Sequence, residues 1–184
     1  MKNNLLNKLE QQELLKIARE TVENYVIHGK MPEFDVANGR LNEKQGAFVT
    51  LSKDGQLRGC IGQIVPIDEP LWRVVRDMAI AACSEDGRFN PVGKDELRQL
   101  EYEISVLSTP EPIDDWRKIK LGEHGVIIKQ GGRSGVFLPQ VATETCWSLE
   151  EFLSELCSQK AGLSPEAYKD KDTQILTFTA QVIK

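Results

Sequence analysis

The residues with the clearest chemical potential lie in one short segment, residues 57–62, which reads Leu-Arg-Gly-Cys-Ile-Gly. A cysteine thiolate is a strong nucleophile, and the fixed positive charge of Arg58 favours the thiolate form of Cys60 if the two groups lie close together. Gly59 and Gly62 provide little side-chain cover, so the sulfur of Cys60 can be approached by a ligand or by another stretch of backbone. The segment therefore predicts a reactive thiol or a tight backbone crossing.

A structural role for Cys60 is the alternative. Free cysteine is among the most buried residue types and often fills a small apolar space. In a strand, alternate residues face opposite ways, so Arg58 and Cys60 should share one face. If that face is solvated, the thiol is exposed, whereas a buried face would require a partner for Arg58. The spacing leaves both interpretations open, and the structural role is the more common one.

A second group of polar residues follows a predicted helix, in the turn-rich segment 84–92. Asp86, Arg88 and Phe89 place an acid, a base and an aromatic ring within four residues. Asp86 can pair with Arg88 or end the preceding helix, and exposed pairs of this kind contribute only ~0–1 kcal/mol. The functional alternative is that Arg88 faces a cleft and binds an anion, because loops often carry binding residues.

Candidate bases are few, because the chain has only two histidines. His28 lies at the end of a predicted helix, where a cation suits the helix dipole. His124 lies in a Gly-Glu-His-Gly turn and is the plausible imidazole base for Cys60, with Glu123 or Glu144 to orient it. The alternative is an ordinary loop histidine that makes structural hydrogen bonds.

Other chemistries have little support in the sequence. The four cysteines form no Cys-x-x-Cys pair, which argues against disulfides, zinc and iron–sulfur clusters, and neither nucleotide-binding glycine motif is present. We therefore expect no cofactor and no metal. A net charge of −5 argues weakly against nucleic acid and anionic membranes. No apolar stretch approaches ~20 residues, and the start of the chain lacks the apolar core of a secretory signal, so we expect a cytoplasmic protein.

The elements that must position these residues read as a mixture of helices and hairpins. Predicted helices span about residues 7–28, begin near Asp68 with Pro70 in the first turn, and begin at the capping box of Ser148 and Glu151. Predicted strands flank the turn 53–55, cover 101–108, flank 130–134, and form one long closing strand over 174–183, whereas 139–142 ends a strand. This order, without regular βαβ alternation, predicts an α+β fold with mainly antiparallel sheet flanked by helices.

The motifs together resemble the AMMECR domain family, named after the Alport syndrome and elliptocytosis chromosomal region. The resemblance rests on residues 57–62 and 86–91, then on 103–108, 122–125, 138–142, Trp147, 152–153 and 160–163, in the expected order. It covers about residues 10–183 and implies one domain over 1–184, with two intertwined α/β subdomains and the motifs gathered around a cleft between them. One departure is Gly87, where the family usually has proline.

The resemblance implies no established reaction, but it suggests a setting. The chain's length resembles that of protein A of the bacterial AmmeMemoRadiSam system, which implies a Memo-like protein and a radical SAM enzyme as partners. Our leading hypothesis is a cysteine-dependent enzyme or substrate-handling component, in which Cys60 is the nucleophile or covalent anchor and Arg58 and Arg88 bind an anionic group.

The rival hypothesis is a non-catalytic module that binds a protein or RNA. In that case Gly59 and Gly62 serve a close backbone approach, Cys60 fills a small space, and Pro139 and Gln140 form part of the rim of the binding cleft. The ligand, whether a small molecule, a protein or RNA, is not identified by the sequence.

Overall fold

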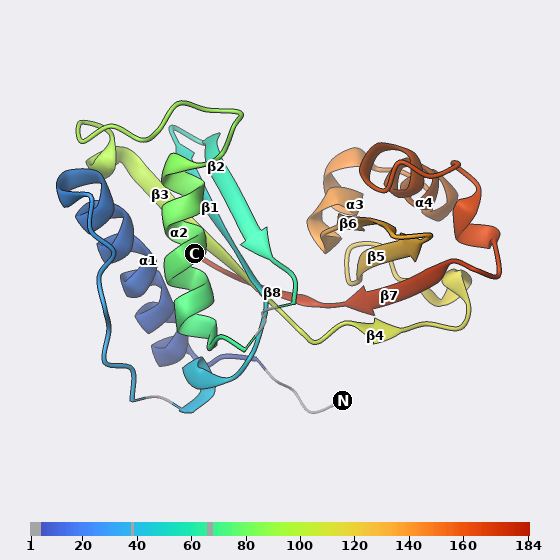
Figure 1. The fold of residues 1–184 in the computed structure, drawn as a ribbon, viewed down its shortest axis with the longest axis horizontal. Helices are drawn as coiled ribbons and strands as arrows, with labels where there is room; N and C mark the ends of the chain where they lie inside the picture. Colours follow the sequence, from blue (N-terminus) through green and yellow to red (C-terminus); the bar gives the residue numbers. More distant parts are fainter. Residues whose placement is uncertain (1–4, 38, 66–67) are drawn as a thin grey trace. The chain divides into compact units, whose positions relative to one another are not determined.

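The computed structural model of the protein describes residues 5–37, 39–65 and 68–184, and the chain divides into two compact units. Unit 1 comprises Met1–Leu107 with Gln181–Lys184, and unit 2 comprises Ser108–Ala180. Each unit has a four-stranded sheet and helices (Figure 1). Each also has its own hydrophobic core. The predicted α+β class with antiparallel sheet is confirmed.

The elements of each sheet and the segments that pack with it have the following bounds. The first sheet and its helices comprise α1 (Lys8–His28), a 3₁₀ turn (Gly39–Asn42), β1 (Ala47–Lys53), β2 (Gln56–Gln63), α2 (Leu71–Ser84), a 3₁₀ turn (Leu97–Gln99), β3 (Leu100–Leu107) and β8 (Ala180–Ile183). The second comprise β4 (Glu111–Pro112), a 3₁₀ turn (Trp116–Lys118), β5 (Gly125–Gln130), β6 (Arg133–Phe137), α3 (Pro139–Thr145), α4 (Leu149–Glu155), a π-helical turn (Leu156–Lys160), a 3₁₀ turn (Ala167–Lys169) and β7 (Gln174–Phe178).

Helix α1 begins and ends at local signals in the sequence. The side chain of Asn7 accepts hydrogen bonds from the N–H groups of Leu9 and Glu10, and the Glu10 carboxylate accepts from the Asn7 N–H at 2.7 Å, which completes a capping box. At the other end Gly29 has a φ of 66°, the left-handed conformation that glycine adopts at low cost. The predicted helix over residues 7–28 is confirmed.

The first hairpin places β2 at the edge of a sheet. Asp54 and Gly55 have φ values of 52° and 72°, so the turn is of the type whose twist suits an antiparallel hairpin. The strand order is β2-β1-β3-β8, with β1 in the interior. One side of β2 is therefore free of strand neighbours, and its outward N–H and C=O groups need other partners.

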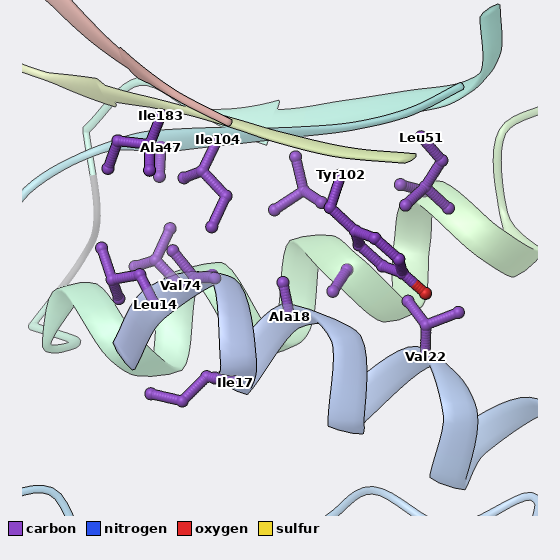
Figure 2. Close-up of a cluster of buried hydrophobic side chains, with 14 of the residues drawn as sticks. Leu14, Ile17, Ala18, Val22, Ala47, Leu51, Val74, Tyr102, Ile104 and Ile183 are labelled. Atoms are coloured by element: carbon purple, nitrogen blue, oxygen red, sulfur yellow. The ribbon is translucent and has the colours of Figure 1, made fainter. Parts of the chain in front are cut away.

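The core of unit 1 lies between one face of this sheet and helices α1 and α2 (Figure 2). Helix α2 packs on β1 and β2, and α1 packs on β3 and on α2. Ala47, Val49 and Leu51 alternate along β1 and are fully buried on the helix-covered face. The residues between them, such as Phe48 and Thr50, point to the opposite face and are half-buried.

Unit 2 has the strand order β4-β7-β5-β6. Gly131 and Gly132, both with positive φ, form a two-residue turn between β5 and β6, so the predicted second hairpin is confirmed with longer strands and a shorter turn. The predicted capping box of α4 is also present, because the Ser148 side chain accepts from the Glu151 N–H and Glu151 accepts from the Ser148 N–H. Buried aromatic and aliphatic side chains of β5, β6 and α4 form the core.

The predicted long strand over residues 174–183 is wrong. The segment forms two strands, β7 and β8, which belong to different sheets and are separated at Thr179. The N–H of Thr179 donates to Ser108 Oγ at 3.0 Å, and its carbonyl accepts from the Ser108 N–H at 2.9 Å. The continuous alternation of apolar residues therefore spans a change of partner rather than one strand.

Two shorter predictions also need correction. Helix α2 begins after Pro70, which is itself the N-cap, and no side chain caps the helix there. Asp68 pairs instead with Lys44, in a backbone conformation with a φ of 62°. Residues 139–142 form the start of α3, because proline is tolerated in the first helical turn.

None of the helices among the described residues is both long and apolar enough to cross a membrane.

Candidate functional site

Strand β2 presents Cys60 and Arg58 in different ways because the strand contains a β-bulge. Cys60 lies directly opposite Thr50 of β1. The pairing then shifts, because Leu51 pairs with Gly59 whereas the next residue, Ser52, pairs with Leu57. Arg58 is thus the extra residue of the bulge and has no partner in β1. The strict alternation that placed Arg58 and Cys60 on one face does not hold across such an irregularity.

Both glycines of the segment accommodate close neighbours. A β-carbon at Gly59 would stand 2.1 Å from the carbonyl oxygen of Ala82, so α2 approaches β2 at a distance that only glycine permits. A β-carbon at Gly62 would stand 2.1 Å from the ring of Phe48, which lies over this position from the paired strand. The glycines therefore have packing roles, and their small size does not by itself expose the thiol.

The Cys60 thiol differs in its surroundings from the other cysteines. Its side chain is half-buried, and its Sγ accepts a hydrogen bond from the Thr50 hydroxyl at 3.2 Å. Burial raises the pKa of Cys83 to about 11 and also raises the pKa of Cys157, which favours the neutral thiol in both. Cys146 is exposed, at the C-terminal end of α3.

The backbone of Cys60 is held on its outer side by two side chains of the loop after α2. Its N–H donates to Asp86 Oδ2 at 2.9 Å, and its carbonyl accepts from Arg88 Nη2 at 3.3 Å. Asp86 and Arg88 are joined by three further bonds: Nε to Oδ1 at 2.9 Å, Nη2 to Oδ2 at 2.7 Å, and the Arg88 N–H to Oδ1 at 3.1 Å. This pair, which we call the edge clamp, bonds the free edge of β2 as a neighbouring strand would.

The two members of the edge clamp differ in exposure. The Asp86 side chain is 5% exposed and the Arg88 side chain 57% exposed. Hydrogen bonding from Arg88, and then from the N–H groups of Cys60 and Arg88, holds the pKa of Asp86 well below its usual range. The guanidinium carbon also lies 5.6 Å from the centre of the half-buried Phe89 ring. Gly87 is exposed and has open space where a β-carbon would stand.

We expect Asp86→Ala to loosen the β2 edge at Cys60. The substitution removes the acceptor of the Cys60 N–H and the partner of Arg88, so the free energy of unfolding should fall by about 2 kcal/mol. Amide hydrogen exchange should accelerate at Cys60, while β1 remains protected by its pairing on both sides. Exchange measured by mass spectrometry on overlapping peptides checks this, and an unchanged rate at Cys60 would mean that the edge clamp does not hold this amide.

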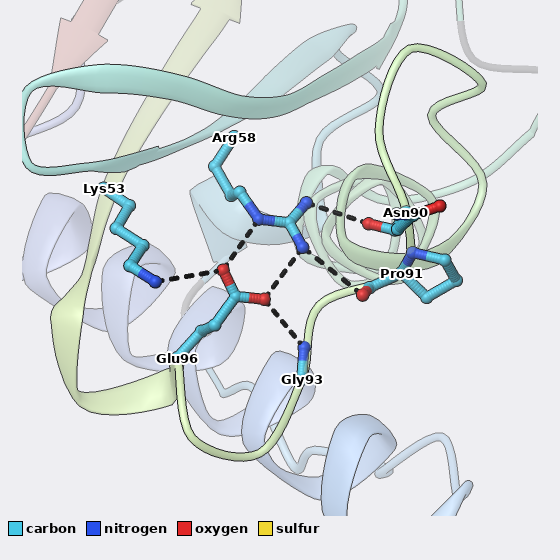
Figure 3. Close-up of polar contacts among 6 residues, drawn as sticks. All are labelled: Lys53, Arg58, Asn90, Pro91, Gly93 and Glu96. Carbon is cyan, nitrogen blue, oxygen red and sulfur yellow. Dashed lines mark hydrogen bonds and ion pairs between the residues drawn. The ribbon is translucent and has the colours of Figure 1, made fainter.

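Arg58 is the centre of a second polar cluster (Figure 3). Its Nε and Nη2 bond the two carboxylate oxygens of Glu96 at 2.9 and 2.8 Å, and its guanidinium also donates to the carbonyls of Asn90 at 2.9 Å and Pro91 at 3.3 Å. Its side chain is only 16% exposed. Arg58 thereby joins β2 to the loop that carries the edge clamp, and its predicted role in binding an external anion stays a prediction.

Glu96 completes this cluster from the residues before β3. Besides Arg58, its carboxylate bonds the Gly93 N–H at 3.0 Å and Lys53 Nζ at 3.3 Å. The hydrogen bond from Arg58, followed by the one from Gly93, lowers the pKa of Glu96 to about 2. Sequence reasoning missed both Glu96 and Thr50. Counting back across the Asp54–Gly55 turn pairs Cys60 with Val49, so only the bulge places Thr50 opposite Cys60, and no local signal identified Glu96.

The remaining predicted site residues lie in unit 2. His124 is half-buried; its Nδ1 accepts from the Lys120 N–H at 3.3 Å, and its Nε2 lies 3.9 Å from Glu123. Pro139 is buried at the start of α3, with half-buried Gln140 beside it. Seven predicted residues are thus brought together in unit 1, whereas the pairing of His124 with Cys60 and the cleft between subdomains stay predictions. No group of three or more His, Cys, Asp or Glu residues within the described ranges is placed to hold a metal.

Comparisons with known proteins agree on one family. A family model described as AMMECR1 matches residues 15–183. Protein NEQ441 of Nanoarchaeum equitans is 43% identical over 179 residues, covering 93% of this chain and 98% of that protein. A protein of Thermococcus gammatolerans is 43% identical over 183 residues, covering 93% and 88%. The crystal structure of uncharacterized protein PH0010 from Pyrococcus horikoshii is similar with a TM-score of 0.85 and 40% identity, covering 94% of this chain and 89% of that one.

Proposed function

This chain belongs to the AMMECR1 family, and we propose that it is a thiol-dependent, substrate-handling protein in which Cys60 is the nucleophile or covalent anchor. The observation that carries the proposal is the hydrogen bond from the Thr50 hydroxyl to Cys60 Sγ at 3.2 Å. An O–H donor aimed at sulfur favours the thiolate over the thiol, because it bonds the charged form. The edge clamp supports the proposal as well, since it fixes the backbone that carries the thiol.

The chemistry follows from the thiolate. Cys60 Sγ attacks an electrophilic carbon of the substrate, a sulfur–carbon bond forms, and the leaving group departs with the electrons of the bond that breaks. The thiol proton passes to a base before the attack, and we propose His124 as this base. As partners we propose a Memo-like protein and a radical SAM enzyme, supported by the resemblance of the motifs to those of protein A of the AmmeMemoRadiSam system.

The test of the proposed function is the pH dependence of alkylation at each cysteine, followed by peptide-mapping mass spectrometry. We expect Cys60 to react in the folded protein, because its thiol is only half-buried and bonded by a hydroxyl donor. Cys83 and Cys157, which are buried, should react only on unfolding and serve as internal references. Thr50→Val should lower the alkylation rate of Cys60, because it removes the hydroxyl donor. It should leave Cys83 and Cys157 buried, because valine has a similar size and shape.

A second candidate function is a non-catalytic module that binds a protein, and the interlocked polar contacts favour it. Arg58, Asp86 and Arg88 all bond within the unit, which explains both motifs without a reaction. If Cys60 reacts only on unfolding, its thiol is structural and this candidate leads. Cys60→Ser separates the two in cells: a thiol-dependent pathway loses its activity, whereas a binding module retains it because the hydroxyl keeps the small size of the side chain.

A further inference from the structure

Four side chains form one row across the first sheet, on the face opposite α1 and α2. Thr50 is the direct cross-strand partner of Cys60 on β2 and also of Glu103 on β3. Lys184 follows Glu103 in the row, because Glu103 Oε2 accepts a hydrogen bond from Lys184 Nζ at 2.9 Å. Directly opposite side chains in a sheet stand about 5 Å apart at their β-carbons, so each member of the row lies next to the following one. The row joins a nucleophile to an ion pair through one hydroxyl group.

We propose that the Glu103–Lys184 ion pair regulates the reactivity of Cys60, a role that rests on the proposed function of this thiol. A negative charge near a thiol opposes formation of the thiolate, and a positive charge beside that negative charge offsets the effect. Glu103 is therefore the residue that restrains Cys60, and Lys184 is the residue that relieves the restraint. Both act as positioning residues, because neither is placed to contact the reacting carbon.

The Glu103–Lys184 ion pair can also affect the thiol through the hydrogen bond that Thr50 donates. A hydroxyl has one proton to donate, and a carboxylate is a stronger acceptor than a neutral thiol. In the structure Thr50 donates to Cys60 Sγ, while Lys184 holds the Glu103 carboxylate. If the lysine leaves, Glu103 becomes free to compete for the Thr50 proton, and Cys60 loses the donor that favours its thiolate.

The exposure of the pair makes it responsive to its surroundings. The Lys184 side chain is 76% exposed and that of Glu103 is 27% exposed, so salt or an anionic partner can separate them with little disruption of the sheet. The other charged groups near the row are Asp86 and Arg88, from the loop after α2, and Glu101, two residues before Glu103 on the same face of β3. Asp86 and Arg88 neutralise each other.

The experiment measures the rate of Cys60 alkylation against pH in the full chain, for Glu103→Gln, Lys184→Met and the double variant. At pH 7 we expect the rate to rise by about threefold in Glu103→Gln and to fall by about threefold in Lys184→Met, which corresponds to about half a pH unit in the profile midpoint. The double variant should match Glu103→Gln, because Lys184 acts only through Glu103.

Glu101→Gln is the matched control. Glu101 has the same charge and lies on the same face, but its cross-strand partner is Ser52 rather than Thr50. Its substitution should change the Cys60 rate less than Glu103→Gln does, and equal effects would overturn the proposal in favour of a general charge effect. If Cys60 reacts readily but neither Glu103→Gln nor Lys184→Met moves its pH profile, the regulatory pair is disproved and the proposed function stands. If Cys60 does not react in the folded native chain, both proposals fall together.

Discussion

Replacing Gly59 with alanine is expected to destabilise unit 1 by about 3 kcal/mol, because the new methyl group has no space. Its β-carbon would stand 2.1 Å from the carbonyl oxygen of Ala82, and this atom belongs to the backbone of α2, which cannot rotate away as a side chain can. Helix α2 must therefore move from β2. Since Asp86 follows the end of α2, we expect the same movement to lengthen its bond to the Cys60 N–H and to speed amide exchange there.

Gly87→Ala is the matched control for this substitution. Gly87 lies in the loop after α2, its φ is not in the left-handed range, and nothing lies within 4 Å of the position of its β-carbon. Its replacement should change the free energy of unfolding by no more than about 0.5 kcal/mol. Urea unfolding followed by circular dichroism compares the two variants. Equal stability of Gly59→Ala and Gly87→Ala would show that α2 does not press on β2 at this point.

The parts of the fold that the sequence predicted are those with local causes. Asn7 and Glu10 define the start of α1 by bonds within four residues, and Asp54 with Gly55 defines the hairpin by its own backbone preference. The prediction of one closing strand was wrong because the break in it has a distant cause. Its alternation of apolar residues continues through Thr179, but the break there depends on Ser108, which lies 71 residues away in the sequence. No property of residues 174–183 alone reveals that partner.

In the candidate site, too, the sequence predicted what residue types reveal and missed what depends on distant partners. The sequence identified Cys60, Asp86 and Arg88 from their residue types, and the structure brings the loop of Asp86 and Arg88 against the edge of β2. It did not reveal the bulge at Arg58, because a bulge changes register without a distinctive residue in this strand. Without the bulge, Arg58 appeared to share a face with Cys60. With it, Arg58 bonds Glu96, a residue 38 positions away that no local pattern connects to it.

Replacing Arg58 with methionine is expected to lower stability at neutral pH by about 3 kcal/mol and to remove much of the sensitivity of unit 1 to acid. Methionine keeps the length of the side chain but leaves the Glu96 carboxylate, 17% exposed, without its main partner. The carbonyls of Asn90 and Pro91 also lose their donor. Lys44→Met is the control, because it breaks an ion pair in which Asp68 is 82% exposed, and should change stability by about 0.5 kcal/mol or less.

The acid dependence follows from the lowered pKa of Glu96. Its value in the folded protein is about 2, below the ordinary 4.5, so the folded state holds the ionised form more strongly than the unfolded chain does. The resulting stabilisation is fully present above pH 4.5, and it disappears as the pH falls toward 2. Linkage assigns it on the order of 2 to 3 kcal/mol. Arg58→Met returns the pKa of Glu96 toward its ordinary value, so this part of the loss on acidification should vanish.

Urea unfolding at pH 6 and at pH 3 measures both expectations at once. The native chain should lose stability between the two values, whereas Arg58→Met, already less stable at pH 6, should lose clearly less. The variant should still lose some, because Asp86, whose pKa is also lowered, remains bonded to Arg88. If the two chains lose equal free energy, Glu96 is not the group that couples acid to unfolding. A smaller loss in the variant instead assigns Arg58 to the support of the loop that clamps Cys60.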